Sequence, residues 1–412
     1  MNIVIDKDAV SLSLETLAGI SEAAPPVVTR VVFSPADLQA RAHVKRLCVE
    51  AGLRVREDAV GNTFARWEGS DPSLPPVATG SHIDAVPYAG RYDGTVGVLG
   101  GLEAIRALSH AGFKPRRSIE LIVFTAEEPT RFGIGCLGSR LLAGALAATA
   151  GQTLKDREGK SLDELRLAAG FAGPLESVRL SPGSCFAFVE LHIEQGRVLE
   201  QRQSELGIVV AIASPASLRV WLEGEGGHAG GVPMPERRDA FLAAAEIALA
   251  VEAAATSSGS SETVGTCGVC EVFPGAINSI PSRVKIELDV RDSDEARRDR
   301  ALQIIRDSIA ASSARRRVAV RTELLNADPP AICDDEVVNA LVRASETHGM
   351  RFERMVSRAY HDALFMARIA PTAMLFIPCR GGVSHRPDEY SSAEAIAGGA
   401  LVLAEALADL AS

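Results

Sequence analysis

The sequence predicts an α/β protein in which a mixed sheet covered by helices is interrupted by an inserted ferredoxin-like α+β domain. Two observations support this fold class. Continuous apolar runs alternate with helical patterns in the first half of the chain and again near its end, which is typical of a sheet with both faces covered. Between these regions, half-exposed strands and helices follow one another in the order β-α-β-β-α-β, which is the ferredoxin-like arrangement.

The covered sheet is expected from continuous apolar runs with helical segments between them. Its predicted elements are strands at 76–82, 118–125, 185–192 and 373–378 and helices at 95–111 and 393–410. Because these elements flank the inserted segment on both sides, residues 1–213 and 330–412 are expected to form one discontinuous catalytic domain.

The inserted segment, expected at 214–329, has a different sequence pattern, in which the strands alternate between apolar and polar residues. Its predicted elements are strands at 217–223, 263–272, 283–291 and 318–324 and helices at 239–255 and 294–313. Cys267 and Cys270 have CxxC spacing within one of these strands, where positions three apart point to opposite faces. A zinc or redox site at this pair is therefore disfavoured.

Composition excludes several classes of protein. The 412-residue chain is 47% hydrophobic, so two or three domains with large cores are expected. A net charge of −10, without basic clusters that contain aromatics, argues against nucleic acid as a partner. Seven cysteines do not form a disulfide framework, and neither a signal peptide nor a membrane-length apolar run is present. The expected location is the cytoplasm, without membrane association.

Metal-ligand residue types follow the predicted apolar strands where each strand ends. They are His82 and Asp84, Asp93 at the start of a helix, Glu127 and Glu128, His192, and His385. Ligands gather at the carboxyl ends of strands in open α/β sheets. Alone, a strand-end histidine is usually a structural hydrogen-bonding residue, and two adjacent glutamates are usually a solvated turn. Their co-occurrence favours a site for two divalent ions.

These residues also match a known family. The set resembles the metallopeptidase-like amidohydrolases related to carboxypeptidase and aminoacylase. Segments 190–196 and 275–281 are similar to the branch that contains N-carbamoyl-L-amino acid hydrolases, allantoate amidohydrolases and ureidopropionases. Within it, segments 357–362, 364–369 and 376–379 resemble the ureidoglycolate amidohydrolases.

The resemblance implies a dinuclear metal centre. His82 and His192 would hold one ion, Glu128 and His385 would hold the other, and Asp93 would bridge the two. Imidazole and carboxylate ligands without thiolate suit several divalent ions. The resemblance favours manganese, with zinc as the alternative.

Two further carboxylates are given roles by the resemblance. Asp84 would accept the second N–H of the His82 imidazole and so fix its tautomer. Glu127 would take a proton from the attacking water and later deliver it to the departing nitrogen.

The resemblance also implies a substrate site. Gln195, Asn278 and Arg291 match residues that contact the substrate, and the planar guanidinium of Arg291 suits a carboxylate. Tyr360 and His361 would shape a small polar pocket. Without the preceding Asn278 motif, Arg291 would be interpreted as an ordinary charge at a strand end.

His228, in a glycine-flanked segment, matches a histidine that reaches the active site of the partner subunit. There it would stabilise the developing oxyanion. A homodimer formed through the inserted domain is therefore implied. On its own motif, His228 would be interpreted as a surface-loop histidine.

The expected reaction is hydrolysis of the ureido C–N bond of ureidoglycolate towards glyoxylate, ammonia and carbon dioxide, in purine nitrogen recovery. The alternatives are an N-carbamoyl-L-amino acid or allantoate amidohydrolase, a peptidase, and a catalytically silent binding or scaffold homologue. Carbamoylases commonly carry Gly-Ala-Gly where this chain has Arg358-Ala359-Tyr360, which weakens the first alternative. The Gln195 and Asn278 motifs argue against a peptidase, and an intact Glu127 argues against a silent homologue.

Overall fold

The computed structural model describes residues 1–412 and divides into two compact units. The main unit comprises Met1–Val210, Ile332–Met355 and His361–Ser412, and the inserted unit comprises Ala211–Ala331 and Val356–Tyr360. The sequence placed the inserted segment at 214–329 and gave no sign that the short returning segment belongs with it. No helix is both long and apolar enough to cross a membrane.

The main unit is built on one mixed sheet with strand order β15-β8-β17-β7-β4-β6-β3-β2, in which β16 also pairs with β8. The four central strands are parallel to one another, and every residue in them is buried. They are β17 (Thr372–Ile377), β7 (Ala187–Ile193), β4 (Val77–His82) and β6 (Ile119–Phe124). The outer strands are β2 (Arg54–Glu57), β3 (Thr63–Trp67), β8 (Leu206–Ile212), β15 (Ala331–Ile332) and β16 (Phe352–Ser357).

Helices cover this sheet, as the buried central strands require. The helices that pack on its strands are α2 (Pro35–Glu50), α3 (Thr95–His110), α10 (Asp335–Thr347), α11 (Asp362–Met366) and α12 (Ala393–Ala411). The unit also contains α1 (Lys7–Ala18), α4 (Leu137–Leu142), α5 (Ala148–Thr153), α6 (Leu162–Ala168) and α7 (Val198–Arg202). A separate two-stranded ribbon pairs β1 (Val28–Arg30) with β5 (Ala85–Ala89). Helix α3 packs closely on the sheet because Gly97 has no side chain: a Cβ there would lie 2.4 Å from the carbonyl oxygen of Leu191.

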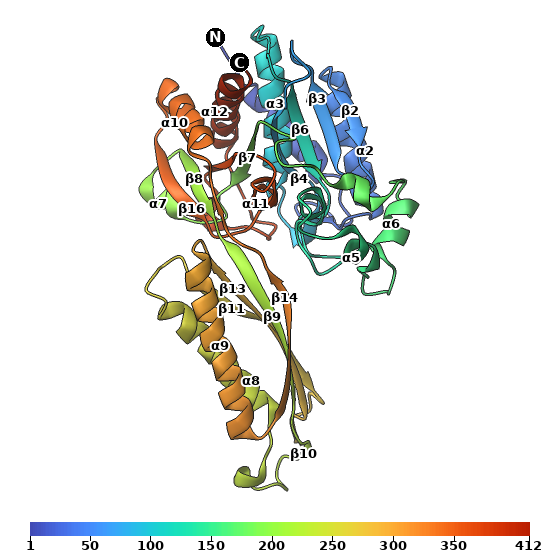
Figure 1. Cartoon of the computed structure of the whole chain (residues 1–412), viewed down its shortest axis with the longest axis vertical. Coiled ribbons are helices and arrows are strands. Elements are labelled where there is room, and N and C mark those ends of the chain that lie inside the picture. The colour runs from blue at the N-terminus through green and yellow to red at the C-terminus, as the bar shows by residue number, and fades with distance from the viewer. The chain divides into compact units, whose positions relative to one another are not determined.

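The inserted unit is an antiparallel four-stranded sheet with α8 (Ala240–Thr256) and α9 (Glu295–Arg316) on one face (Figure 1). The strand order is β11-β13-β9-β14. The strands are β9 (Ser214–Glu223), β11 (Val264–Phe273), β13 (Arg283–Asp292) and β14 (Ala319–Ala327). In chain order this is the 2-3-1-4 arrangement of a ferredoxin-like sheet, so the predicted fold class is confirmed.

Alternation along the strands explains the core of the inserted unit. On β13, every second residue is buried, as expected for a sheet with one face covered. Val220, Ile286, Ile247 and Ile305 come from two strands and the two helices and belong to one buried apolar cluster. A small ribbon, β10 (Gly227–His228) with β12 (Ser279–Ile280), lies at one end of the unit (Figure 1).

Candidate metal centre

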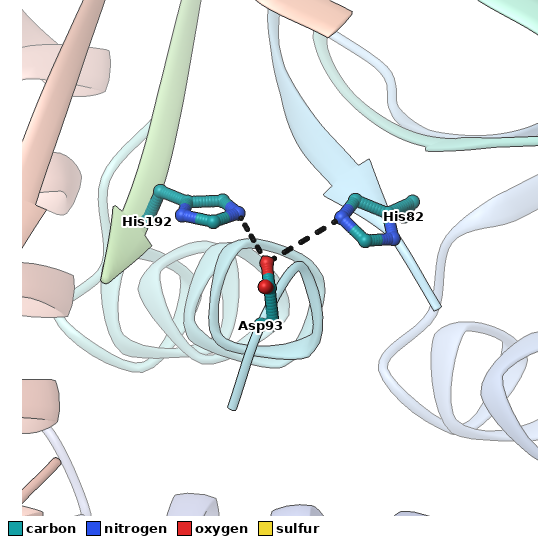
Figure 2. Close-up of side chains that lie close together, drawn as sticks. All are labelled: His82, Asp93 and His192. Atoms are coloured by element: carbon teal, nitrogen blue, oxygen red, sulfur yellow. Dashed lines mark ion pairs between the residues drawn. The ribbon is translucent and has the colours of Figure 1, made fainter. Parts of the chain in front are cut away.

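The metal-ligand residue types of the main unit converge at the carboxyl ends of its parallel strands. His82 is the last residue of β4, His192 is near the end of β7, and Asp93 precedes α3 by two residues. Their side chains point toward one another (Figure 2). The neighbouring strands are in register, with His82 paired to Phe124 of β6, so the Glu127–Glu128 turn that follows β6 lies at the same edge.

Three groups of side chains are close enough to hold an ion: one consists of Glu190, His192 and His361, and the other two share Asp93. Ligand atoms of His82, Asp93 and His192 lie within 4.8 Å of one another, as do those of Asp93, Glu128 and His385. Asp93 belongs to both groups through different oxygens. Its Oδ1 is 3.1 Å from His192 Nε2, and its Oδ2 is 3.1 Å from His385 Nε2. This is the arrangement that a carboxylate bridging two ions needs, so the residues present fit a dinuclear centre.

The electrostatics of the cluster also favour cations. Burial acts against a charged His82, but attraction from Glu127, Asp84 and Asp93 raises the pKa of the imidazole well above its usual value. Hydrogen bonds to Asp93 and Glu128 raise the pKa of His385 to about 11. The carboxylates thus require nearby positive charge, and bound divalent cations would supply it in place of protons.

Backbone carbonyls orient both buried imidazoles. His82 Nδ1 lies 3.0 Å from the carbonyl oxygen of Asp84, and His192 Nδ1 lies 2.9 Å from that of Ile193. If Nδ1 carries the proton, each Nε2 is available to a metal on the side of Asp93.

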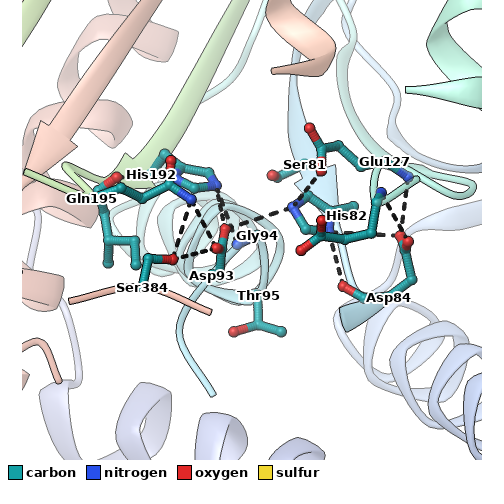
Figure 3. Close-up of polar contacts among 12 residues, drawn as sticks. Ser81, His82, Asp84, Asp93, Gly94, Thr95, Glu127, His192, Gln195 and Ser384 are labelled. Carbon is teal, nitrogen blue, oxygen red and sulfur yellow. Dashed lines mark hydrogen bonds and ion pairs between the residues drawn. The ribbon is translucent and has the colours of Figure 1, made fainter. Parts of the chain in front are cut away.

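The carboxylate of Asp84 has a different contact from the one expected. It lies 3.6 Å from His82 Nδ1 and accepts the backbone N–H groups of Glu127 (3.2 Å) and Glu128 (3.1 Å). Asp84 therefore shapes the turn that carries both glutamates, while its backbone carbonyl contacts the imidazole. Figure 3 shows Asp84 beside Glu127 and His82.

Glycine at position 94 allows the chain to pass close to His82. Gly94 has a φ of 67°, and a Cβ there would lie 2.4 Å from His82 Nε2. Any side chain at this position would occupy the space beside a candidate ligand atom.

Three polar side chains hold Asp93, and two of them, Gln195 and Ser384, lie on the side opposite His82 (Figure 3). Gln195 Nε2 donates to Asp93 Oδ2 at 2.8 Å, and Ser384 Oγ donates to the same oxygen at 2.6 Å. Glu389 accepts the backbone N–H groups of Tyr92 and Asp93 at 2.7 and 3.0 Å. Gln195 was expected at the substrate, whereas Ser384 and Glu389 were given no role. Their proximity to His385 in the sequence was the available signal.

Glu127 is buried beside the cluster but belongs to neither ligand group. Its Oε2 is 3.6 Å from His82 Nε2, and the thiol of Cys136 donates to its Oε1 at 3.4 Å. Burial raises the pKa of this carboxyl well above its usual value. A buried carboxylate next to candidate metal ligands is suited to proton transfer.

The adjacent residues Tyr360 and His361 fall in different units. His361 is buried in the main unit, with its ring centroid 4.5 Å from that of His192. Tyr360 is in the inserted unit, where the Arg291 guanidinium lies 5.3 Å from the centre of its ring.

The remaining candidate residues lie at opposite ends of the inserted unit. His228 pairs with Ser279 across the β10–β12 ribbon, and the Asn278 carbonyl accepts the N–H of Ala229 at 2.8 Å. In the chain, this ribbon adjoins the end of the four-stranded sheet where Arg283 of β13 pairs with Glu223 of β9. Arg291 lies eight residues further along β13, about 26 Å away at the usual rise of a strand. One small molecule cannot contact both ends within a single chain.

Comparison with known proteins gives the class. Residues 78–409 match the model of peptidase family M20/M25/M40, and the chain belongs to this family of hydrolases.

Within the family, the chain is 52% identical to a ureidoglycolate hydrolase from Arabidopsis thaliana, over 98% of this chain and 87% of the relative. A crystal structure described as AtUAH in complex with glyoxylate superposes with a TM-score of 0.93 at 51% identity, covering 99% of this chain and 98% of that one. An N-carbamoyl-L-amino acid amidohydrolase from Geobacillus stearothermophilus is 40% identical over 91% of both chains. The resemblance stated from the sequence motifs is confirmed.

Proposed function

We propose that the protein hydrolyses the ureido C–N bond of ureidoglycolate at a centre of two divalent metal ions, towards glyoxylate, ammonia and carbon dioxide. The observation that carries this proposal is the Asp93 carboxylate, whose two oxygens face two separate ligand groups beside a buried Glu127. Likeness to a ureidoglycolate hydrolase over nearly the whole chain supports the choice of substrate.

His82 and His192 would hold one ion, Glu128 and His385 the other, and Asp93 both. When bound, two such ions lower the pKa of a shared water and polarise a carbonyl oxygen. The nitrogen and oxygen ligands suit manganese, which we favour, and zinc, which is the alternative.

Glu127 would move the proton. The carboxylate reaches the cluster with Oε2, while Oε1 accepts the Cys136 thiol hydrogen, so its orientation is defined. In this position it can accept a proton from water and return it to the departing nitrogen. The adjacent Glu128 faces His385 at 3.2 Å and would be a metal ligand, which gives the two glutamates separate functions.

Arg291 would bind the carboxylate of the substrate through its guanidinium. Tyr360 lies against that guanidinium, and the buried His361 lies against His192. Tyr360 and His361 are proposed as pocket residues on the strength of the sequence resemblance, and Gln195 contacts Asp93.

His228 and Asn278 would serve the active site of a partner subunit. Since both are in the β10–β12 segment, at the far end of the inserted unit from Arg291, one substrate can contact all three only if two chains contribute. We therefore assign His228 and Asn278 together to the partner's site, where His228 would stabilise the oxyanion.

A surface for such a homodimer is available on the inserted unit. Strand β11 is a ten-residue edge strand that pairs only with β13, and unpaired edges invite pairing with another chain. Phe273 on this strand is exposed, as are Phe241 and Leu249 on α8, which packs against β11. Pairing of β11 with its copy would bury this apolar surface.

A second candidate, hydrolysis of N-carbamoyl-L-amino acids or allantoate, is supported by the 40% identity to the Geobacillus enzyme. It is opposed by Arg358 and Tyr360, since the bulky side chain of Tyr360 occupies space beside Arg291. A cytoplasmic location remains part of the proposal.

The test is turnover by the purified, manganese-loaded or zinc-loaded protein on three substrates side by side: ureidoglycolate, allantoate and N-carbamoyl amino acids. Ammonia release should give the highest kcat/KM for ureidoglycolate. A higher value for either other substrate would move the protein to the second candidate, and no turnover of any substrate would favour a silent homologue.

A further inference from the structure

Arg291 is held by a neighbour on its own strand. Its Nε donates to Asp289 Oδ1 at 2.7 Å, and the two residues share one face of β13 because side chains alternate along a strand. Ser217 lies directly opposite Asp289 on β9, and its hydroxyl donates to Asp289 Oδ2 at 3.2 Å. Both carboxylate oxygens of Asp289 therefore have donors within the sheet.

Tyr360 contacts the same guanidinium through its ring. The distance of 5.3 Å from Arg291 Cζ to the ring centroid is within the range of a cation–π contact. Tyr360 ends the returning segment Val356–Tyr360, which is fastened to the inserted unit by Arg358. Its guanidinium donates to both carboxylate oxygens of Glu262, at 3.1 and 3.0 Å. The segment that ends with Tyr360 is thus anchored by an ion pair within the inserted unit.

We propose that Asp289 is a positioning residue for substrate binding: it holds the Arg291 guanidinium, against the Tyr360 ring, in the orientation that receives the substrate carboxylate. This inference rests on the proposed function, in which Arg291 contacts the substrate. The side chains of Arg291 and Asp289 are 28% and 31% exposed, and ion pairs this exposed contribute little to folding. Orienting a long side chain before binding removes an entropic cost from the binding step.

The same strand offers a matched control. Glu287 lies two residues before Asp289, on the same face of β13, and accepts the Nε–H of Arg219 at 2.8 Å. Arg219 and Glu287 are 31% and 27% exposed, so the two ion pairs are alike in sheet face, in the contact of an arginine Nε with a carboxylate, and in exposure, although Arg219 comes from the neighbouring strand β9. They differ in that Arg219 has no place in the proposed active site.

The experiment compares Asp289→Asn with Glu287→Gln in the full-length, metal-loaded protein. For Asp289→Asn we expect KM for ureidoglycolate to rise about tenfold, equivalent to ~1.4 kcal/mol, with kcat nearly unchanged. Glu287→Gln should change neither constant, and both variants should melt at the wild-type temperature. Because Asp289 acts through Arg291, adding Asp289→Asn to Arg291→Lys should raise KM little further.

Glyoxylate binding, measured by calorimetry, gives a readout that does not depend on turnover, and Asp289→Asn should weaken it about as much as it raises KM. Ser217→Ala provides a second variant, with a smaller effect in the same direction. Unchanged KM and glyoxylate affinity in Asp289→Asn would overturn the inference, as would an equal change in Glu287→Gln. If Arg291→Lys weakens binding while Asp289→Asn does not, only this inference fails. If wild-type protein turns over no ureido substrate, the proposed function fails, and glyoxylate affinity still decides the role of Asp289.

Discussion

In the main unit, the candidate ligands His82 and His192 lie at the ends of completely buried strands, and both are close to Asp93. In the inserted unit, the candidate substrate residues are more exposed and lie at the two ends of one strand, β13. The first arrangement brings its ligand groups together within one chain. The second can serve a single small substrate only when two chains contribute. The proposed hydrolysis therefore depends on the fold of one chain, whereas the proposed substrate binding depends on the assembly of two chains. Mutations can disrupt either one separately.

The largest effect is expected from Asp93→Ala. Since one carboxylate faces both ligand groups, its loss should remove both ions and all measurable activity. Elemental analysis after dialysis checks the metal content. Asp388→Ala is a suitable control, because Asp388 is an exposed carboxylate that pairs with Arg386 and lies close in sequence to His385. Retention of two ions per chain by Asp93→Ala would contradict the bridging role.

Glu127→Gln should separate metal binding from turnover. Removal of a general base typically lowers the rate by about 10²–10⁴-fold, and the isosteric amide should leave the metal content unchanged because Glu127 is in neither ligand group. Single-turnover kinetics and elemental analysis on the same preparation measure both effects. Loss of metal together with activity would instead make Glu127 a ligand, and a near-normal rate would exclude it as the base.

His228→Ala tests whether one active site uses residues from one chain or from two. Its homodimer should lose about 10²–10³-fold in kcat, as is typical when an oxyanion donor is removed. If His228 acts in the partner's site, a mixed dimer with Glu127→Gln has one intact site and one site with both defects. Subunit exchange should then restore up to half of the wild-type activity per mixed dimer, measured after exchange is verified by mass.

Asn278→Ala sharpens the same experiment. Because His228 and Asn278 belong to one ribbon, Asn278→Ala should complement Glu127→Gln but not His228→Ala, since in the latter mixed dimer each site receives one defective ribbon from its partner. Verified exchange without any recovery between His228→Ala and Glu127→Gln would place His228 in its own chain's site and remove the main support for a functional dimer.

The difference between the two units also explains which features the sequence could predict. The main strands and helices depend on local apolar runs and periodicity, and α3 was expected at 95–111 against the observed Thr95–His110. The ligand types were visible because each one follows an apolar strand. The roles of Ser384 and Glu389 could not be predicted from the sequence, because these residues belong to a loop that contacts Asp93 from almost 300 residues away.

Two other features were outside the reach of sequence patterns for physical reasons. A sequence shows that Asp84 follows His82 by two residues, but it does not show whether the imidazole meets the carboxylate or the backbone carbonyl. The separation of Asn278 from Arg291 is likewise invisible, since thirteen residues can return on themselves or extend along a strand. Here most of them extend along β13.

The smallest effect is expected from Arg291→Lys, which leaves the metal centre of the main unit untouched. Lysine keeps the positive charge but cannot form the two parallel hydrogen bonds that a planar guanidinium makes with a carboxylate. It would also lose the Nε–H that Asp289 accepts. Loss of a charge-assisted hydrogen bond costs about 1.5–3 kcal/mol, so KM should rise about 10- to 100-fold, with two ions still bound and kcat changed much less than in Glu127→Gln. Steady-state kinetics with ureidoglycolate and elemental analysis measure both. Arg219→Lys, at the matched ion pair on the same sheet face, controls for general effects of the substitution. If Arg291→Lys and Arg219→Lys have the same KM as the wild type, Arg291 does not contact the substrate, and the carboxylate must be bound elsewhere.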